Sequence, residues 1–313
     1  STRETAVGTR SRPMRLDRCL FATAALAGPR AAPLTMTTTT VATVDTASIK
    51  AQILQTAALT DRGQRLNTLI APTYQEKRAI FSNLVEQLVA AQSGPITEAA
   101  LEGEWELVFS EVELFRSSPF FLAIEEALNN SPNIPALGRW LGLTDPSKKA
   151  ELFFKLHQLQ VLSWGVSTVG RIAQRLEFGE SARLESEFDT TIFGLTVIPI
   201  IGWFKLLPTF GGRVVTEADR LALDADGTLR MELQRTRVIT APGIPRIPLL
   251  DGLLMDRWYP VNSVWKLLPW NGGPFDGRPP TCSMKVEYVD EQMRVSRDGA
   301  GAVFVYTRPQ AVP

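Results

Sequence analysis

Histidine and cysteine are almost missing from this chain, which holds one histidine and two cysteines among 313 residues. Structural zinc sites need four Cys or His ligands, and His-based catalytic sites need several histidines, so neither can be assembled. An internal disulfide would need Cys282 together with Cys19, which lies in the N-terminal segment described below. We therefore predict no metal site and no disulfide framework.

Catalytic motifs are missing as well. The sequence has no G-x-x-x-x-G-K-[ST] phosphate loop, no G-x-G-x-x-G after a strand and no G-x-S-x-G nucleophile elbow. A Ser-His-Asp triad would depend on His157 alone, and the helical stretch "ELFFKLHQLQ" around it favours a structural role. Carboxylates are abundant, but their spacing identifies no catalytic pair. We predict no catalytic residues and a non-enzymatic protein, with a carboxylate-based lipid-modifying enzyme as the weakest alternative.

The chain also lacks net charge and a membrane-length apolar run. Its 33 basic and 33 acidic residues balance, so electrostatics give no reason to expect a nucleic-acid partner. The longest apolar stretch, "TIFGLTVIPIIGWF" at 191–204, contains Gly194, Pro199 and Gly202 and is too short for a transmembrane helix. We expect a soluble or peripheral protein.

Acidic residues are scarce in residues 1–45, and lysine is absent there. The segment is rich in Ala, Thr and Ser, which together with arginine is typical of an organelle transit peptide. A plain disordered tail has the same composition, so both interpretations stay open. The six arginines of the segment are Arg3, Arg10, Arg12, Arg15, Arg18 and Arg30.

Residues 46–95 are predicted to form a helical lead-in. Apolar residues in "PTYQEKRAIFSNLVEQLV" recur at helical spacing and mark one buried face. The tetrapeptide "TDRG" at 60–63 interrupts the preceding helix, with Gly63 as its stop signal. The loop "SGPITEAA" at 93–100 then separates this helical hairpin from the rest of the chain.

Between residues 103 and 308 the apolar period becomes that of β-strands. In "GEWELVFSEVELF" large apolar residues occupy every second position, as in a strand with one buried face. Similar runs flank turns at 226–227 and 298–301, and about eight strands can be counted. Two short helices, "SSPFFLAIEEALNN" and "DPSKKAELFFKLHQL", interrupt them. We predict an α+β, mainly β protein whose antiparallel strands close into a barrel over residues 96–313, because closure removes exposed sheet edges.

Two distant segments indicate how such a barrel closes. The first strand begins with Gly103-x-Trp105, and the last hairpin carries Arg294 and Arg297 beside the apolar residues Met293 and Val295. In lipocalin-like barrels, a Gly-x-Trp indole fills the base and an arginine of the last strand stacks on it. We predict this closure with Arg294, or with Arg297 in its place. The alternative is an exposed arginine on an edge strand.

Several segments resemble the plastid lipid-associated protein, or fibrillin, family. The resemblance covers roughly residues 50–309, and the segments 130–165 and 241–280 are longer than is typical. It is carried by "RG" at 62–63, "LEGEWELVFS" at 101–110, "ELFRSSPFF" at 113–121 and "YVDEQMRVSRDGAGAVFVYTRP" at 288–309. In the last segment, Asp290, Arg294, Arg297, Gly301 and Phe304 keep the places of the family's closing hairpin, whereas Met293 and Asp298 depart from it.

The resemblance implies a lipocalin-like barrel in plastids, associated with thylakoids or plastoglobules, that binds or organises a prenylquinone, carotenoid or acyl lipid. It implies no cofactor beyond such a bound molecule. The Arg-rich N-terminus agrees with that compartment. For each interior residue, packing in a filled core is the alternative to lining a ligand. The expected interior residues are Trp105, Leu107, Phe109, Phe188, Phe193, Leu223, Met231 and Tyr288.

Two stretches rich in Trp and Pro each contain Lys-Leu-Leu-Pro, at 205–208 and 266–269. Indole rings and a snorkelling lysine suit a membrane interface or a lid at the barrel mouth, whereas loops that only cover the core are the alternative. Membrane or partner contacts are expected at Trp203, Phe204, Trp258, Trp265 and Trp270.

Two function classes follow from these features. In the first, the barrel carries or stores a small hydrophobic molecule at a thylakoid or plastoglobule membrane surface. In the second, side chains fill the barrel, and the Trp/Pro-rich loops dock onto a thylakoid membrane complex or a biosynthetic enzyme, so that the protein is a scaffold or accessory subunit. We favour the first.

Overall fold

The computed structural model describes residues 45–67, 73–130, 145, 148–155, 169–193, 210–240, 255–261 and 280–309. The predicted transit segment, His157 and the two Lys-Leu-Leu-Pro tetrapeptides lie outside the described residues, apart from Asp45 at the end of the transit segment.

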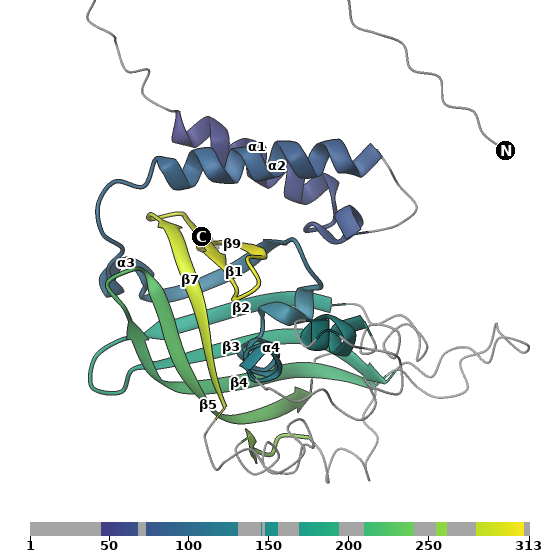
Figure 1. Ribbon diagram of the computed structural model, residues 1–313. Helices are drawn as coiled ribbons and strands as arrows, with labels where there is room; N and C mark the ends of the chain where they lie inside the picture. Colours follow the sequence, from purple (N-terminus) through teal and green to yellow (C-terminus); the bar gives the residue numbers. More distant parts are fainter. Residues whose placement is uncertain are drawn as a thin grey trace, which may run out of the picture. The chain divides into compact units, whose positions relative to one another are not determined.

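Eight antiparallel strands form a closed barrel (Figure 1). Neighbouring strands follow the order β4-β3-β2-β1-β9-β8-β7-β5, and β5 pairs back with β4 to complete the ring, while the short β6 pairs with β5. The predicted mainly β barrel of about eight strands is therefore confirmed. The strands are β1 Gly103–Ser110, β2 Val169–Glu177, β3 Arg183–Phe193, β4 Phe210–Leu223, β5 Thr228–Thr240, β6 Tyr259–Pro260, β7 Thr281–Val289, β8 Met293–Arg297 and β9 Val303–Thr307.

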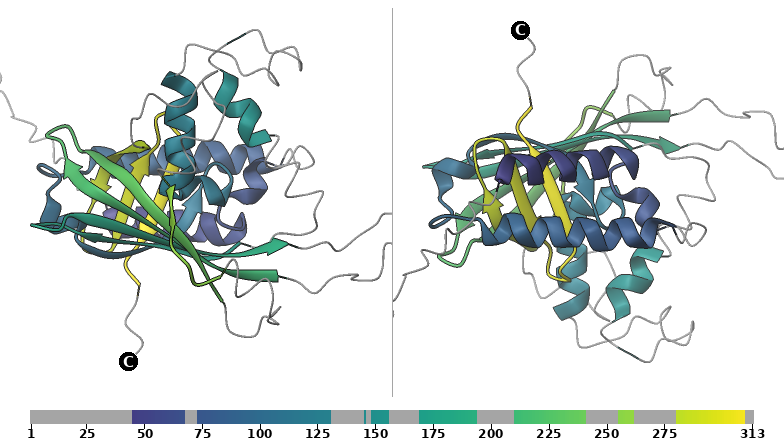
Figure 2. Two further views of the ribbon diagram at one scale, coloured as in Figure 1. Left: turned by 90° about the horizontal axis from the view of Figure 1, so that it is seen from below. Right: turned by 90° about the horizontal axis from the view of Figure 1, so that it is seen from above.

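Two helices of the N-terminal part lie side by side across one outer face of the barrel (Figure 2). These are α1, Thr46–Leu59, and α2, Thr73–Ala90, which match the predicted helical hairpin. A further helix, α4 at Pro119–Asn130, packs against the barrel core instead of the outer face. Residues 149–155 are helical as predicted. The other short elements are η1 Gln64–Asn67, α3 Glu98–Leu101, η2 Leu114–Ser117 and α4 Pro119–Asn130.

The strands that carry the helices bury both of their faces. On β8, Met293 and Val295 pack with α1 and α2, whereas the alternate residues Arg294 and Ser296 face the barrel interior. Phe81 of α2 stacks on Phe109 of β1, with ring centroids 3.6 Å apart. Burial on both sides explains why β9, Val-Phe-Val-Tyr-Thr, is almost continuously apolar, whereas β8 alternates between apolar residues beneath the helices and polar residues in the interior.

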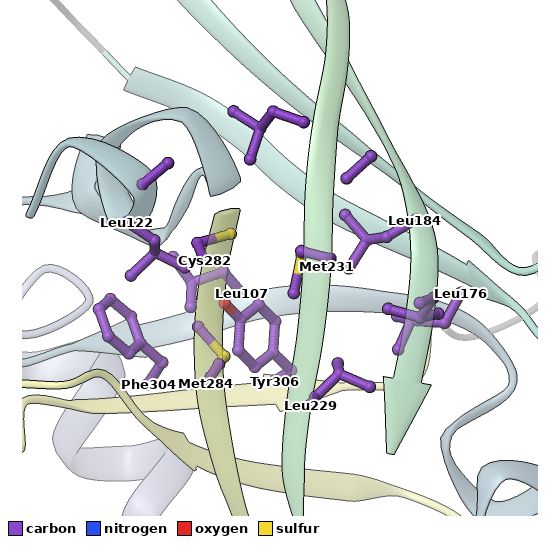
Figure 3. Packing of buried hydrophobic residues seen from close by; sticks show 14 of the residues in the cluster. Leu107, Leu122, Leu176, Leu184, Leu229, Met231, Cys282, Met284, Phe304 and Tyr306 are labelled. Atoms are coloured by element: carbon purple, nitrogen blue, oxygen red, sulfur yellow. The ribbon is translucent and has the colours of Figure 1, made fainter. Parts of the chain in front are cut away.

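The barrel interior is an apolar cluster with residues from most strands and from α4 (Figure 3). Leucine, methionine and aromatic side chains from opposite walls point toward one another there, together with the buried Cys282. Figure 3 labels Leu107, Leu122, Leu176, Leu184, Leu229, Met231, Cys282, Met284, Phe304 and Tyr306 of this cluster.

Two predicted interior residues, Phe109 and Tyr288, lie on the other side of the wall. Both are buried in the cluster beneath α1 and α2. The register shifts between Leu107 and Phe109 on β1, and again between Val286 and Tyr288 on β7. A bulge of one residue turns all later side chains to the opposite face, which simple alternation cannot anticipate. Their assignment to the interior was wrong.

The loop between α1 and α2 fastens the helices to the barrel. Arg62 donates to the carbonyl oxygens of Gly170 and Val169 on β2, at 2.6 and 2.7 Å. Gly63 follows with φ +89°, so close to β1 that a Cβ on it would lie 2.2 Å from the Ser110 carbonyl oxygen. The "RG" dipeptide of the sequence is thus a point where helix and barrel are joined.

Replacing Gly63 by Ala should destabilise the fold more than replacing Gly94 by Ala. Both glycines have φ near +90°, but nothing lies within 4 Å of a Cβ on Gly94. Backbone strain is therefore common to both variants, and the added steric overlap in Gly63→Ala costs about 1–3 kcal/mol more. Urea unfolding measures the difference, and equal losses of stability would contradict the described loop packing.

Candidate functional site: the barrel closure and its polar interior

Trp105 lies near the start of β1 and is completely buried. Its indole Nε1 donates to the Leu101 carbonyl oxygen at 2.8 Å, so the polar atom of the ring is satisfied. The guanidinium of Arg308, just after β9, lies 3.9 Å from the centroid of the indole ring. A large ring and a stacked cation therefore join the first and last segments of the barrel.

Arg308 also binds backbone carbonyl groups of the segment that leads from α3 into β1. Its Nη1 donates to the Glu102 carbonyl oxygen at 2.5 Å, and its Nη2 donates to the Ala100 carbonyl oxygen at 3.1 Å. A Cβ on Gly103, which has φ +99°, would lie 2.6 Å from Arg308 Nη1. Glycine in the Gly-x-Trp motif thus leaves room for the arginine.

The sequence predicts that Arg294 stacks on Trp105. In the structure both Arg294 and Arg308 lie near the indole ring. Arg294 is 5.3 Å from the Trp105 ring centroid but only 4.1 Å from that of Tyr306. Arg308 has the closer stacking and the carbonyl contacts, and the sequence reasoning missed it. Its position directly after the last strand was the available signal.

Arg297 does not take part in the closure. It lies three residues after Arg294 on the same strand, so its side chain points to the opposite face. There its Nε donates to Glu287 and its Nη2 donates to Glu86 of α2, each at 2.6 Å. The prediction that Arg297 could replace Arg294 was wrong, and its contacts hold the helix to the barrel.

A polar belt crosses the interior at the level of Trp105. We define this belt as Gln174, Ser186, Thr216 and Thr236, which occupy inward positions on β2, β3, β4 and β5. They are cross-strand neighbours: Trp105 pairs with Gln174, Gln174 with Ser186, Ser186 with Thr216, and Thr216 with Thr236. The sequence reasoning missed all four, because the belt becomes visible only when the register of the strands is known.

Arg294 and Tyr306 complete the belt from the side of β8 and β9. Arg294 Nη2 donates to Gln174 Oε1 at 2.6 Å, and Gln174 Nε2 donates to the hydroxyl oxygen of Tyr306 at 3.2 Å. The Nε and Nη1 of Arg294 have no hydrogen-bond partner, and neither do the hydroxyls of Ser186 and Ser296. Among the described residues, four of the eight buried side-chain N and O atoms without a hydrogen-bond partner therefore belong to Arg294, Ser186 and Ser296 in the interior.

Burial shifts the pKa values of Arg294 and Tyr306. Desolvation lowers the pKa of Arg294 to about 10, which leaves the guanidinium charged at neutral pH. Desolvation raises the pKa of Tyr306 to about 12, so its phenol remains neutral. A buried positive charge beside neutral partners can attract an oxygen-bearing or anionic group.

The remaining predicted interior residues differ in how deeply they are buried in the barrel. Trp105, Leu107 and Met231 are buried in the interior cluster, and Phe188 and Leu223 pack at its margin. The side chain of Phe193 lies outside the described part of the molecule.

Of the predicted contact residues, the structure describes Trp258. Its half-buried ring lies 4.3 Å from the guanidinium of Arg235 and 4.3 Å from that of Arg237. Trp203, Phe204, Trp265 and Trp270 fall outside the described ranges, so their membrane or partner contacts stay predictions.

A second polar cluster joins α4 to the turn between β8 and β9. Arg116 Nη2 lies 2.9 Å from Glu125 Oε1 and 3.7 Å from Asp298 Oδ2. Desolvation, increased by repulsion from Asp298, raises the pKa of Glu125, and desolvation also raises the pKa of Asp298. A cleft of about 280 Å³ beside it is lined by Leu122, Glu125, Glu126, Asn129, Asn130, Ser283 and Gly299.

Within the described ranges, no group of three or more His, Cys, Asp or Glu side chains is placed to hold a metal ion. No described helix is long and apolar enough to cross a membrane. In comparisons with known proteins, no family model, no curated protein and no solved structure matches the chain. The resemblance to the plastid lipid-associated family therefore stays a prediction.

Removing Arg308 should destabilise the barrel strongly. Arg308→Ala loses the indole stacking and the carbonyl hydrogen bonds, at an expected cost of about 2–3 kcal/mol in the free energy of unfolding. The matched control is Arg175→Ala, since that side chain is 64% exposed and pairs with Glu177 at 3.1 Å. The control should lose less than about 1 kcal/mol. Equal losses in urea unfolding would show that Arg308 does not close the barrel.

The second polar cluster, formed by Arg116, Glu125 and Asp298, should make the free energy of unfolding depend on pH. Glu125 binds its proton more tightly in the folded chain than in the unfolded chain, so its contribution is full below the unfolded pKa and is lost as pH rises through the raised folded pKa. Asp298 titrates in the same direction, while Arg116 opposes both.

Glu125→Gln should therefore flatten the decline of unfolding free energy as pH rises above the ordinary glutamate value of 4.5. Glu180→Gln, at an exposed turn, is the control and should keep the wild-type profile. Chemical unfolding at several pH values between 4 and 8 provides the measurement. Parallel profiles for wild type and Glu125→Gln would refute the assigned role.

Proposed function

We propose that this is a non-enzymatic plastid lipid-associated protein that binds or organises a small hydrophobic molecule at thylakoid or plastoglobule surfaces. The observation that carries the proposal is the closed barrel, whose apolar interior contains a band of unpartnered polar atoms around Arg294. A prenylquinone, carotenoid or acyl lipid is the class of ligand considered. Such a molecule combines, in most cases, an apolar body with a small polar end.

The chemistry of the interior supports uptake of an apolar body. The walls hold leucine and methionine side chains, including Met231 and Met284, and methionine adapts readily to ligands of irregular shape. Each buried methylene of a ligand contributes about 0.8 kcal/mol, so a modest number already gives useful affinity. The resemblance in sequence and the Arg-rich first 45 residues support the plastid compartment.

The scaffold alternative has one observation in its favour. The ring of Trp258 contacts two arginines of β5, Arg235 and Arg237, and the residue is close in sequence to the Trp/Pro-rich segment that follows β6. Tryptophan and arginine are enriched at protein interfaces. In this alternative, a partner protein rather than a lipid is the main binding target.

Native mass spectrometry of the purified full chain, with extraction of bound lipids, separates the two functions. The proposal predicts a co-purifying hydrophobic molecule, released on unfolding, in a ratio approaching one per barrel. A chain free of bound lipid that also fails to take up palmitate, β-carotene or a prenylquinone from detergent would contradict lipid binding and leave the scaffold.

Membrane association should depend on the Trp/Pro-rich segments. The double variant Trp203→Ala/Trp265→Ala should float with liposomes several-fold less than the wild type, because interfacial indoles contribute to membrane binding. The control is Leu59→Ala, which removes an exposed apolar side chain of α1 outside both segments and should float like the wild type. Flotation unaffected by the double substitution would remove the membrane contact from the proposal.

A further inference from the structure

Arg294 is the one arginine of the described residues that is buried, and it differs from the partly exposed arginines Arg116, Arg297 and Arg308 in what it binds. It is 1% exposed and among the largest fully buried side chains. Arg116 and Arg297 each pair with a carboxylate, and Arg308 binds backbone carbonyl groups. Arg294 has one neutral amide oxygen, that of Gln174, for its Nη2. Arginine is almost never fully buried unless it is paired.

The neighbours of Arg294 are fixed, and none of them can neutralise it. Gln174 Nε2 donates to the Ser117 carbonyl oxygen and to Tyr306, which holds the amide with its oxygen toward Arg294. Tyr306 contributes a neutral phenol. Arg308 stacks on the same indole as Arg294, so a second positive charge lies nearby. Among the described residues, no carboxylate forms an ion pair with Arg294.

We infer that Arg294 selects ligands that end in a carboxylate, so that the barrel takes a long-chain monocarboxylic acid with its head group among Arg294, Gln174 and Ser186. This inference rests on the proposed function and narrows its ligand class. The unpartnered Nε and Nη1 of Arg294 provide the donors, and the unpartnered Ser186 hydroxyl provides a third. The leucine and methionine side chains of the interior receive the acyl chain.

The three ligand classes differ in how well they satisfy this site. A carboxylate accepts hydrogen bonds and also neutralises the buried charge, and such charge-assisted bonds are about twice as strong as neutral ones. A quinone carbonyl accepts hydrogen bonds but leaves the charge uncompensated. A carotenoid hydrocarbon does neither, and it leaves the donors of Arg294 without a partner. The expected order of affinity is carboxylate, then quinone, then hydrocarbon.

Palmitate and methyl palmitate are the matched probes, because they share a chain and differ in the charge of the head group. Their affinities for the full-length protein can be compared by isothermal titration at pH 7. The readout is the ratio of the two affinities, since general damage to the barrel lowers both alike. Wild type should favour palmitate by about 10-fold or more.

Variants at two positions on β8 test the assignment. Arg294→Gln should bring the ratio close to one, and Arg294→Lys, which keeps the charge, should retain part of the preference. Arg297→Gln is the control, because Arg297 faces outward and pairs with Glu287 and Glu86, and its ratio should equal that of wild type. If Arg294→Gln fails to fold, the ratio of the two affinities in Arg294→Lys and in the wild type still tests whether Arg294 selects a carboxylate.

The outcomes separate this inference from the function on which it rests. A wild type that binds both probes equally overturns the selection of a carboxylate and leaves lipid binding in place. An unchanged preference in Arg294→Gln overturns the role of Arg294. A wild type that binds neither probe, while binding a prenylquinone or carotenoid, overturns the carboxylate class alone. Binding of none of these molecules overturns the proposed function itself.

Discussion

The contact between Trp105 and Arg308 holds the two ends of the barrel together. Its parts are one buried indole, one guanidinium 3.9 Å from it, and a glycine whose missing side chain gives the guanidinium access to carbonyl groups. Because β1 pairs with β9 and the residues after β9 return to the start of β1, this contact fixes the register of the closing strands. The interior behind it depends on that register.

The strands β8 and β9, next to the contact between Trp105 and Arg308, border two separate apolar clusters. Their inward residues face the apolar interior of the barrel, and their outward residues support α1 and α2. A buried cation without a counter-ion is costly, and an apolar residue at position 294 would commonly be as stable or more stable. Arg294 packs on the Tyr306 ring beside neutral partners held in fixed positions, and the inference above assigns the missing negative charge to a ligand.

Strong periodicity was sufficient to predict the fold class and the helical hairpin, whereas the proximity of Trp105 and Arg294 was predicted from the likeness to lipocalin-like barrels. It could not give the faces of Phe109 and Tyr288, since bulges on β1 and β7 reverse the alternation. The belt residues share no motif and are brought together only by strand register.

A double-mutant cycle between Trp105 and Arg308 tests the central contact most directly. The variants Trp105→Phe, Arg308→Met and their combination are compared by urea unfolding, so that losses peculiar to either side chain cancel. A direct stacking contact predicts a coupling free energy of about 1–2 kcal/mol. A coupling indistinguishable from zero, with both single variants folded, would contradict a barrel held closed by this pair.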